Sequence, residues 1–309
     1  MRKSDFIIKY GISYIDKKLL HMNFEEKVVK FDGIISENEC NELIGKHLES
    51  GECFMACKFG STELANVTYY SLQPFVSKQR KKMVIDKLYT YSGFFPNDYE
   101  LLPRFCEVML ESLTKADILG NCTTIQEQYL LEKYAPKCQS AKGYLEPWGF
   151  ENPWTYFLKG KKVLVIHPFA DTITKQYKRR EKLYENPKML PEFELRTIKA
   201  VQTLADETDN RFSNWFEALD YMCLEAQKID FDVALIGCGA YGMPLAAKIK
   251  EMGKCAIHMG GSLQLLFGIW GSRWENSKGI KSRKNEYWVR PSEKETIKSA
   301  EIIEGGCYW

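Results

Sequence analysis

The stretch that most constrains the fold of this 309-residue chain is residues 231–253. An apolar run, Phe231–Ile236, leads into a Gly-x-Gly-x-x-Gly turn, and Met243–Met252 has the composition of a helix. A strand that meets such a turn at the start of a helix is typical of α/β proteins that bring backbone N–H groups close to a phosphate. Glycine suits this turn because a side chain would hold the phosphate away. We therefore expect phosphate or nucleotide contacts at Gly237, Gly239, Tyr241 and Gly242.

The next apolar run argues against a dinucleotide. A nicotinamide-binding unit carries an acidic residue at the end of its second strand, where the carboxylate binds a ribose. Here the run Cys255–His258 ends in His258-Met259-Gly260-Gly261, with no acidic residue. An NAD(P)-dependent oxidoreductase is therefore the weaker alternative for this turn.

Composition excludes several classes of protein. A net charge of +2 gives no general attraction to nucleic acid, and 45% hydrophobic residues are typical of a globular protein. Ten cysteines in a chain of this length do not form a disulfide scaffold. No secretory signal and no apolar run near about eighteen residues is found, which predicts a cytoplasmic protein without a transmembrane segment. A homo-oligomer is left open.

The order of apolar runs predicts an α/β fold with a Rossmann-like, mostly parallel sheet flanked by helices. Buried strands are expected at Cys53–Phe59, Asp117–Gly120 and Lys162–His167, and helices at Ser36–Ser50 and Leu101–Leu113. Ile198–Leu204 fits a strand or a helix equally well. The predicted division is an N-terminal extension (1–34), an α/β domain in two halves (35–155 and 156–275) and a C-terminal tail (276–309).

One segment carries a resemblance to a known family. Lys58-Phe59-Gly60-Ser61-Thr62-Glu63-Leu64 resembles the Arg-Phe-Gly-Asp-Gly-Glu-Leu signature of GT-D-type glycosyltransferases, bacterial enzymes of glycoprotein and surface-polysaccharide assembly. The resemblance implies a GT-D-like fold and a nucleotide sugar as donor. It also implies that Lys58, Gly60 and Ser61 contact the donor.

The same resemblance implies a divalent metal, Mn²⁺ or Mg²⁺, with Glu63 as a ligand and a catalytic residue. Ser61 stands where the family has Asp. This departure matters because a hard cation that bridges phosphates prefers carboxylate oxygens. The segment retains only one such carboxylate, and a hydroxyl at the predicted N-cap of the next helix.

Three further residues are catalytic candidates. His167 and His258 both end predicted strands, and Asp171 follows the first of these. Since ligands bind at the carboxyl ends of strands in open α/β sheets, each of the three is a candidate general base for an acceptor hydroxyl. Arg179 lies in a basic run, residues 175–182, and is a candidate contact for a diphosphate.

These observations favour a nucleotide-sugar-dependent glycosyltransferase of surface-polysaccharide or glycoconjugate biosynthesis. Its partners would be a small-molecule nucleotide sugar and a glycan or lipid-linked acceptor. The main alternative belongs to another functional class: a non-catalytic protein that binds nucleotides or sugar nucleotides. The presence of Ser61 in place of the family's Asp favours this alternative.

Overall fold

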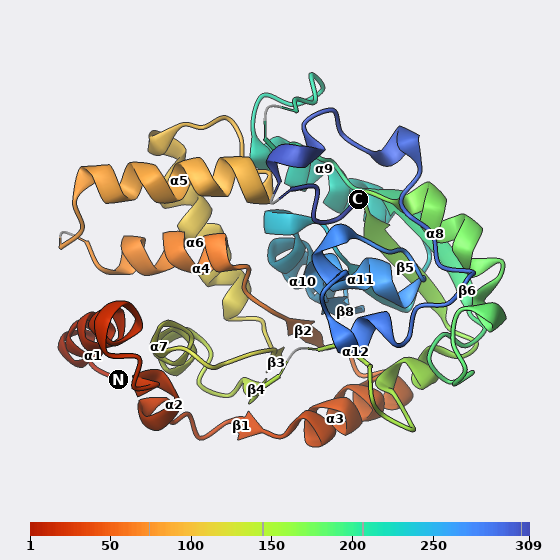
Figure 1. Cartoon of the computed structure of the whole chain (residues 1–309), viewed down its shortest axis with the longest axis horizontal. Helices are drawn as coiled ribbons and strands as arrows, with labels where there is room; N and C mark the ends of the chain where they lie inside the picture. The colour runs from red at the N-terminus through yellow and green to blue at the C-terminus, as the bar shows by residue number, and fades with distance from the viewer. Residues whose placement is uncertain (74, 144, 206, 304) are drawn as a thin grey trace.

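The computed structural model describes residues 1–309 except for residues 74, 144, 206 and 304. Its centre is one sheet of eight strands, all paired in parallel (Figure 1). The strands are β1 (Ile34–Ile35), β2 (Met55–Cys57), β3 (Ile118–Leu119), β4 (Gln139–Ala141), β5 (Lys162–His167), β6 (Glu194–Lys199), β7 (Val233–Ile236) and β8 (Cys255–His258). Their order across the sheet is β1-β4-β3-β2-β8-β7-β5-β6. The predicted α/β class with a parallel sheet is confirmed.

Helices cover both faces of this sheet. They are α1 (Lys3–Ile15), α2 (Phe24–Val28), α3 (Glu37–Ser50), α4 (Ser61–Ser71), α5 (Lys78–Ser92), α6 (Leu102–Leu113), α7 (Ile125–Tyr134), α8 (Ala170–Tyr177), α9 (Trp215–Gln227), α10 (Gly242–Glu251), α11 (Leu263–Leu266) and α12 (Lys278–Lys281). Short 3-10 turns lie between them, and one of these, Gly239–Tyr241, precedes α10. Within the described part of the chain, no helix is long and apolar enough to cross a membrane.

The central strand β5 is apolar from Val163 to Ile166 because both of its faces are covered. In β5, Leu164 and Ile166 join the core that packs under α6, α9 and α10, whereas Val163 and Val165 join the core on the opposite face. All four side chains are fully buried. Strands buried on both faces are expected to form continuous hydrophobic runs, and such runs revealed these strands in the sequence.

Two helix starts follow the local rules closely. Ser36 accepts a hydrogen bond from the Glu39 N–H, and the Glu39 carboxylate accepts from the Ser36 N–H, which completes a capping box at α3. Thr124 and Glu127 form the same box at α7. The start of α4 differs from the prediction, because Gly60 occupies the N-cap and no side chain caps the helix. Ser61 is instead the first residue of α4.

Pairing of β2 with β8 joins the two halves of the chain. Met55 lies opposite Ala256 and Ala56 opposite Ile257, and the Ala256 N–H donates to the Phe54 carbonyl at 2.9 Å. The predicted strand Cys53–Phe59 is therefore shortened to the three residues that pair with β3, with β8 or, at Ala56, with both. Because every strand runs the same way, all carboxyl ends lie at one edge of one sheet.

The C-terminal tail is packed against the second half of the sheet. The Trp309 indole N–H donates to the Glu295 carbonyl at 3.0 Å, and the Trp309 ring contacts Phe169 with centroids 5.9 Å apart. The buried Glu295 carboxylate accepts hydrogen bonds from the N–H groups of Asp171 and Thr172 at the start of α8. The tail thereby reaches the carboxyl edge of β5.

We predict that Asp117→Ala destabilises the fold by about 1–3 kcal/mol. The Asp117 carboxylate accepts from the Met55 N–H at 2.7 Å and binds the Lys250 ammonium at 2.7 Å, so it joins β2 to α10. Urea unfolding measures the change. Asp230→Ala, which removes an exposed ion pair with Lys162, is the control and should change little. Equal effects of the two variants would contradict a joining role for Asp117.

Candidate functional site

Four neighbouring strands bring most of the predicted site residues to one edge. Lys58 follows β2, His258 ends β8, Gly237 follows β7 and His167 ends β5, and these strands are adjacent in the sheet. Parallel strands with ligands at their carboxyl ends are the usual arrangement in α/β proteins. The structure therefore groups residues that are up to two hundred positions apart in the sequence.

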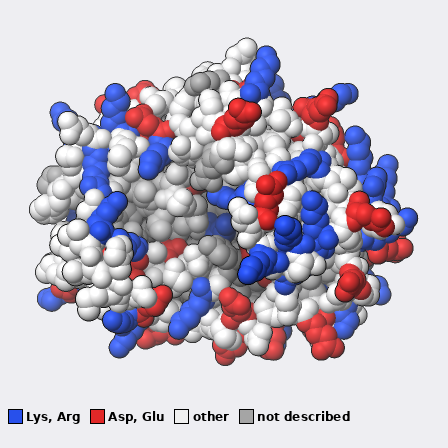
Figure 2. Space-filling model, in the orientation of Figure 1, with Lys and Arg blue, Asp and Glu red and all other residues white. Residues whose placement is uncertain are grey.

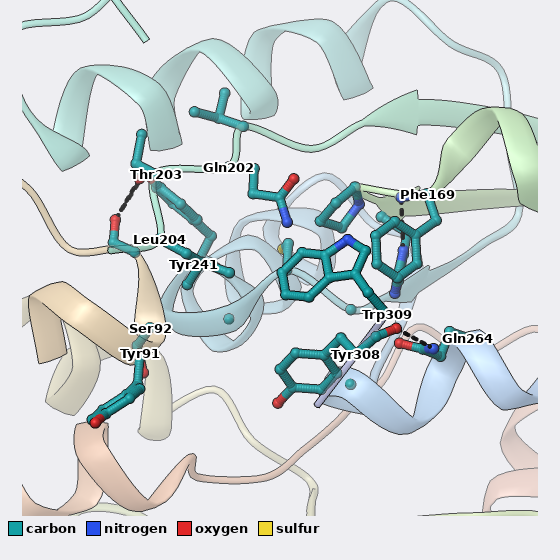
Figure 3. Close-up of a pocket in the computed structure, with 18 residues that line it drawn as sticks. Tyr91, Ser92, Phe169, Gln202, Thr203, Leu204, Tyr241, Gln264, Tyr308 and Trp309 are labelled. Atoms are coloured by element: carbon teal, nitrogen blue, oxygen red, sulfur yellow. Dashed lines mark hydrogen bonds between the residues drawn. The ribbon is translucent and has the colours of Figure 1, made fainter. Parts of the chain in front are cut away.

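A pocket of about 580 Å³ opens at this edge (Figure 3). Its walls come from six parts of the chain: the end of α5, the end of β5, the end of β6, the glycine turn, the α11 region and the C-terminus. Figure 3 shows the rings of Tyr308 and Trp309 beside each other between Tyr241 and Phe169. The described wall residues are Tyr91–Gly93, His167–Phe169, Val201–Leu204, Gly237–Gly239, Tyr241, Gly261, Gln264, Tyr308 and Trp309.

The glycine turn is held by protein contacts on most of its sides. Gly239 has a φ of +57°, and a Cβ there would lie 2.8 Å from the Ser92 carbonyl oxygen. A Cβ on Gly237 would lie 2.7 Å from the Gly260 carbonyl oxygen and 2.8 Å from the His167 ring. Among the described residues, no backbone carbonyl accepts a hydrogen bond from the N–H groups of Cys238, Gly239 and Ala240. The turn therefore combines a crowded exterior with donors that remain for a ligand.

Tyr241 lies behind this turn. Its side chain is buried and stacks on Trp215 with ring centroids 5.2 Å apart. Its hydroxyl is 3.3 Å from the Thr203 hydroxyl, and Thr203 donates to the Gly93 carbonyl. Burial raises the pKa of Tyr241. This residue joins the turn to the end of α5, so it shapes the pocket wall.

His258 packs directly on the third glycine of the turn. A Cβ on Gly242 would lie 2.0 Å from the His258 ring, and the His258 Nδ1 is 3.3 Å from the Ile236 carbonyl oxygen. Because a carbonyl only accepts, Nδ1 carries the proton. Burial, with the nearby Lys58 cation, lowers the pKa of His258 to about 3. Gly242 and His258 thus form a packing pair behind the site.

His167 lines the pocket, and its ring also holds the local backbone. The Phe169 N–H donates to the His167 Nδ1 at 3.0 Å, which places the ring proton on Nε2. Burial lowers the pKa of His167 to about 3, although Glu295 opposes this change. A base with so low a pKa takes a proton poorly at neutral pH.

Lys58, Gly60 and Glu63 form a compact unit beside the pocket. The Glu63 side chain folds back over Gly60, where a Cβ would lie 2.0 Å from its Oε2, and accepts from the Thr62 hydroxyl at 2.8 Å. Thr62 is hydrogen-bonded to Ser92, which is a wall residue. Burial raises the pKa of Glu63, against the effect of these hydroxyls and Lys58. One hydroxyl therefore separates this carboxylate from the wall of the pocket.

Lys58 reaches the same edge from β2. A Cβ on Gly260 would lie 2.7 Å from its Cε and 3.3 Å from its Nζ. Burial lowers the pKa of Lys58, while Glu146 and Glu63 act in the opposite direction. The Lys58 ammonium group therefore lies against Gly260, in the loop that follows β8.

The side chains at this edge do not fit a metal centre built by the protein. In the described part of the chain, no group of three or more His, Cys, Asp or Glu side chains is placed to hold an ion. Glu63 is 5% exposed and already engaged by Thr62, and Ser61 is an exposed residue that offers only a hydroxyl. A hard cation prefers several oxygen ligands, at least one or two of them carboxylates. We therefore derive no step through a metal ion.

Of the predicted site residues, His167, Gly237, Gly239 and Tyr241 line the pocket. Lys58, Gly60, Ser61, Glu63, Gly242 and His258 lie beside or behind it, and Asp171 and Arg179 belong to neither group. Asp171 is exposed in the first turn of α8, where its backbone N–H binds Glu295. Arg179 is exposed beyond the end of α8, beside Arg180, whose guanidinium pairs with Glu192 at 3.3 Å. Since Glu192 precedes β6, this basic run lies at the amino ends of the strands, and the structure does not bring Arg179 to the site.

Several wall residues were missed in the sequence. Tyr91, Gln202, Thr203, Gln264 and the pair Tyr308–Trp309 belong to no motif and come from segments far apart in the chain. The only signal was indirect, since aromatic residues near the end of a polar tail indicate packing. Their side chains give the pocket planar rings and amide groups, which suit sugars and nucleobases.

The chain matches no protein-family model and no curated protein. Two solved structures align with 85% of this chain and 92% of their own, at 12% identity. One is a selenomethionine-substituted structure of domain of unknown function 1792, with a TM-score of 0.40. The other is described as a highly conserved domain of unknown function 1792 that has a distinct glycosyltransferase fold, with a TM-score of 0.38. Neither similarity is strong enough to carry an activity to this chain.

We predict that Gly242→Ala destabilises the protein by about 1–3 kcal/mol, because the new methyl group overlaps the His258 ring. The backbone is helical at Gly242, so the conformation itself accepts alanine. In a His258→Ala background the same substitution should cost much less. Urea unfolding of the four proteins measures this coupling. If Gly242→Ala lowers the free energy of unfolding equally in both backgrounds, contact with His258 is not the reason for glycine at this position.

The two buried histidines should also make the fold sensitive to acid. Between pH 6.5 and about 3 the unfolded chain binds protons that the folded chain does not, so the free energy of unfolding falls as the pH falls. Each histidine contributes a slope of about 1.4 kcal/mol per pH unit. His167→Gln or His258→Gln should therefore reduce the wild-type slope, measured by urea titrations across this range. The control is His21→Gln, at an exposed position, which should keep the wild-type slope. If His167→Gln and His258→Gln also keep that slope, burial of the two histidines does not cause the acid sensitivity.

Proposed function

We propose that the protein is a glycosyltransferase that uses a nucleotide sugar, and that the pocket binds this donor. One observation carries the proposal. The glycine turn after β7 and the Lys58–Glu63 segment, which the sequence singles out independently, meet at the same edge beside an aromatic-walled pocket.

The donor would be held by groups of complementary chemistry. The N–H groups of Cys238, Gly239 and Ala240 suit a diphosphate, because they are donors at the start of a helical segment. The Lys58 ammonium lies near the same edge and would offset the charge that develops on the departing diphosphate. The rings of Tyr308 and Trp309 offer faces on which a nucleobase or a sugar can stack.

Within this proposal Glu63 is the base for the acceptor hydroxyl. His167 and His258 are poor bases because burial lowers the pKa of each to about 3. Burial moves the pKa of Glu63 the other way, upward, which is the direction a general base needs at neutral pH. The Thr62 and Ser92 hydroxyls connect it to the pocket and offer a path for the proton.

The biological setting is also a proposal. We propose a cytoplasmic enzyme that acts on a glycan or lipid-linked acceptor in the assembly of a surface polysaccharide or glycoconjugate. A free divalent ion, Mn²⁺ or Mg²⁺, would enter with the donor phosphates, since the described side chains form no group of three or more possible ligands.

A second candidate is a protein that binds a nucleotide sugar without turning it over. The burial of Glu63 favours it, because this carboxylate is 5% exposed and is engaged by a neighbouring hydroxyl. An oxidoreductase remains the weakest reading, since β8 ends in His258 and no acidic residue is there to bind a ribose.

We predict that a panel of nucleotides and nucleotide sugars contains ligands that raise the thermal stability of the protein. A ligand at 100 times its Kd adds about 2.7 kcal/mol of stability, which a thermal-shift assay detects. Gln202→Ala removes an amide from the pocket wall and should weaken that binding about tenfold, or about 1.4 kcal/mol. The matched control is Gln227→Ala, an exposed residue on α9, which should bind as wild type does.

Glu63→Gln separates the two candidate functions within the same experiment. It should keep ligand binding and lower transfer or donor hydrolysis by at least about tenfold, measured with and without Mn²⁺. Binding without turnover in the wild type would favour the non-catalytic candidate. A panel in which only NAD(P)H stabilises the protein would overturn both.

A further inference from the structure

Helix α1 carries an unpartnered row of aliphatic side chains. Ile8, Ile12, Ile15 and Leu19 recur at intervals of four, three and four residues, and their exposed fractions are 62%, 42%, 50% and 75%. The spacing places them on one side of the helix and of the π-helical turn that continues it. The opposite side of α1 is buried, with Phe6 stacked on Tyr129 at 4.1 Å.

More exposed apolar side chains lie near this row. Leu20 and Met22 follow it directly, with exposed fractions of 55% and 59%. Phe75, 71% exposed, lies in the loop between α4 and α5, which meets α1 where the Lys3 ammonium donates to the Gln73 carbonyl. Figure 1 shows this loop and α1 at the same end of the molecule. Single exposed apolar residues are normal, but several gathered at one end of a molecule indicate a contact surface.

The surroundings of this row are basic. Segments 2–22 and 78–87 carry ten Lys and Arg but three Asp and Glu, a formal charge of +7. The whole chain carries +2, so the remainder carries −5. The two segments are in contact, because the Arg80 guanidinium lies over the Tyr14 ring at 4.8 Å from its centroid. Figure 2 shows Lys and Arg side chains over α5 and at the margin of the largely uncharged surface over α1.

We propose that this surface, the outer side of α1 with the neighbouring loop and the basic side of α5, binds a bilayer that contains anionic phospholipids. Helix α1 would lie in the interface, with its aliphatic row among the acyl chains and its lysines at the headgroups. An apolar stripe flanked by Lys and Arg is the pattern of helices that lie on membranes. Anionic headgroups match the local charge of +7.

A second copy of the chain is a poorer occupant for the same surface. A two-fold contact through α1 would place the same patch on both subunits, so two surfaces of +7 would face each other. Like charges at short range oppose such a contact, whereas a bilayer supplies the opposite charge. The proposal concerns a surface outside the pocket and does not depend on glycosyl transfer.

Vesicle flotation with the full chain tests the proposal. Vesicles of phosphatidylcholine mixed with phosphatidylglycerol should bind the protein, vesicles of phosphatidylcholine alone should bind it far less, and ~0.5 M NaCl should weaken the binding. A triple variant of the row should lower the partition coefficient at least about tenfold. This variant is Ile8→Gln with Ile12→Gln and Leu19→Gln, and its apolar control is Leu224→Gln with Ile302→Gln, at positions 55% and 51% exposed.

Charge is tested in the same way. Replacing three lysines of the surface by glutamine should reduce binding to anionic vesicles, and replacing three exposed lysines elsewhere should reduce it much less. The surface set is Lys9, Lys18 and Lys82, and the control set is Lys159, Lys178 and Lys278. Thermal unfolding of each variant, run alongside, shows that the fold is kept.

The opposing outcomes are clear. The proposal is overturned if the wild-type protein does not bind anionic vesicles at low salt. It is also overturned if the control variants lose binding as strongly as the row variant. A lipid-free sample that sediments as a dimer and becomes a monomer in the row variant would assign the surface to a second copy instead. None of these results bears on the pocket, whose ligands are measured separately.

Discussion

The pairing of β2 with β8 is the contact on which the rest of the structure depends. Two register pairs and one backbone hydrogen bond of 2.9 Å from Ala256 to Phe54 join strands that lie two hundred residues apart. Without this pairing the chain would have two four-stranded sheets with two separate carboxyl edges. With it, Lys58 and the glycine turn after β7 are separated by one strand only.

The parts of the fold that the sequence predicted well are those in which local and tertiary preferences agree. The strand Lys162–His167 has the predicted bounds because both faces of β5 are covered, so its inner residues form a continuous apolar run. Helix α3 begins after Ser36, as predicted, because its capping box is entirely local. Ile198–Leu204 could not be assigned in the sequence, and in the structure the strand β6 ends at Lys199. Only Ile198 and Lys199 of that run belong to β6, and the rest of it follows the strand without regular structure.

Elements that depend on distant partners could not be predicted. Strands β1 and β4 contain two and three residues, too few for a pattern, and they exist because they pair with each other. The glycine motif was located correctly, yet its three glycines are required largely by protein neighbours: the Ser92 carbonyl, the Gly260 carbonyl and the His258 ring. The position of the basic run around Arg179 could not be derived from the sequence, because it depends on α8, whose eight residues lead the chain away from the carboxyl edge. Likewise, the tail residues of the pocket wall are recognisable only once the chain is folded.

The Glu295 carboxylate has a further consequence for how the pocket behaves. Its contacts with the N–H groups of Asp171 and Thr172 hold residues 292–303 and 305–309 across the end of β5, and the latter supply Tyr308 and Trp309 to the pocket. The pocket is therefore an assembly of a rigid sheet edge and a docked strap, and only molecules with the strap in place present the full wall. Any ligand that stacks on those rings must bind the docked population, so its apparent affinity is scaled by the fraction of molecules in that state. Residues at the strap's anchor can thus tune ligand affinity without touching the ligand.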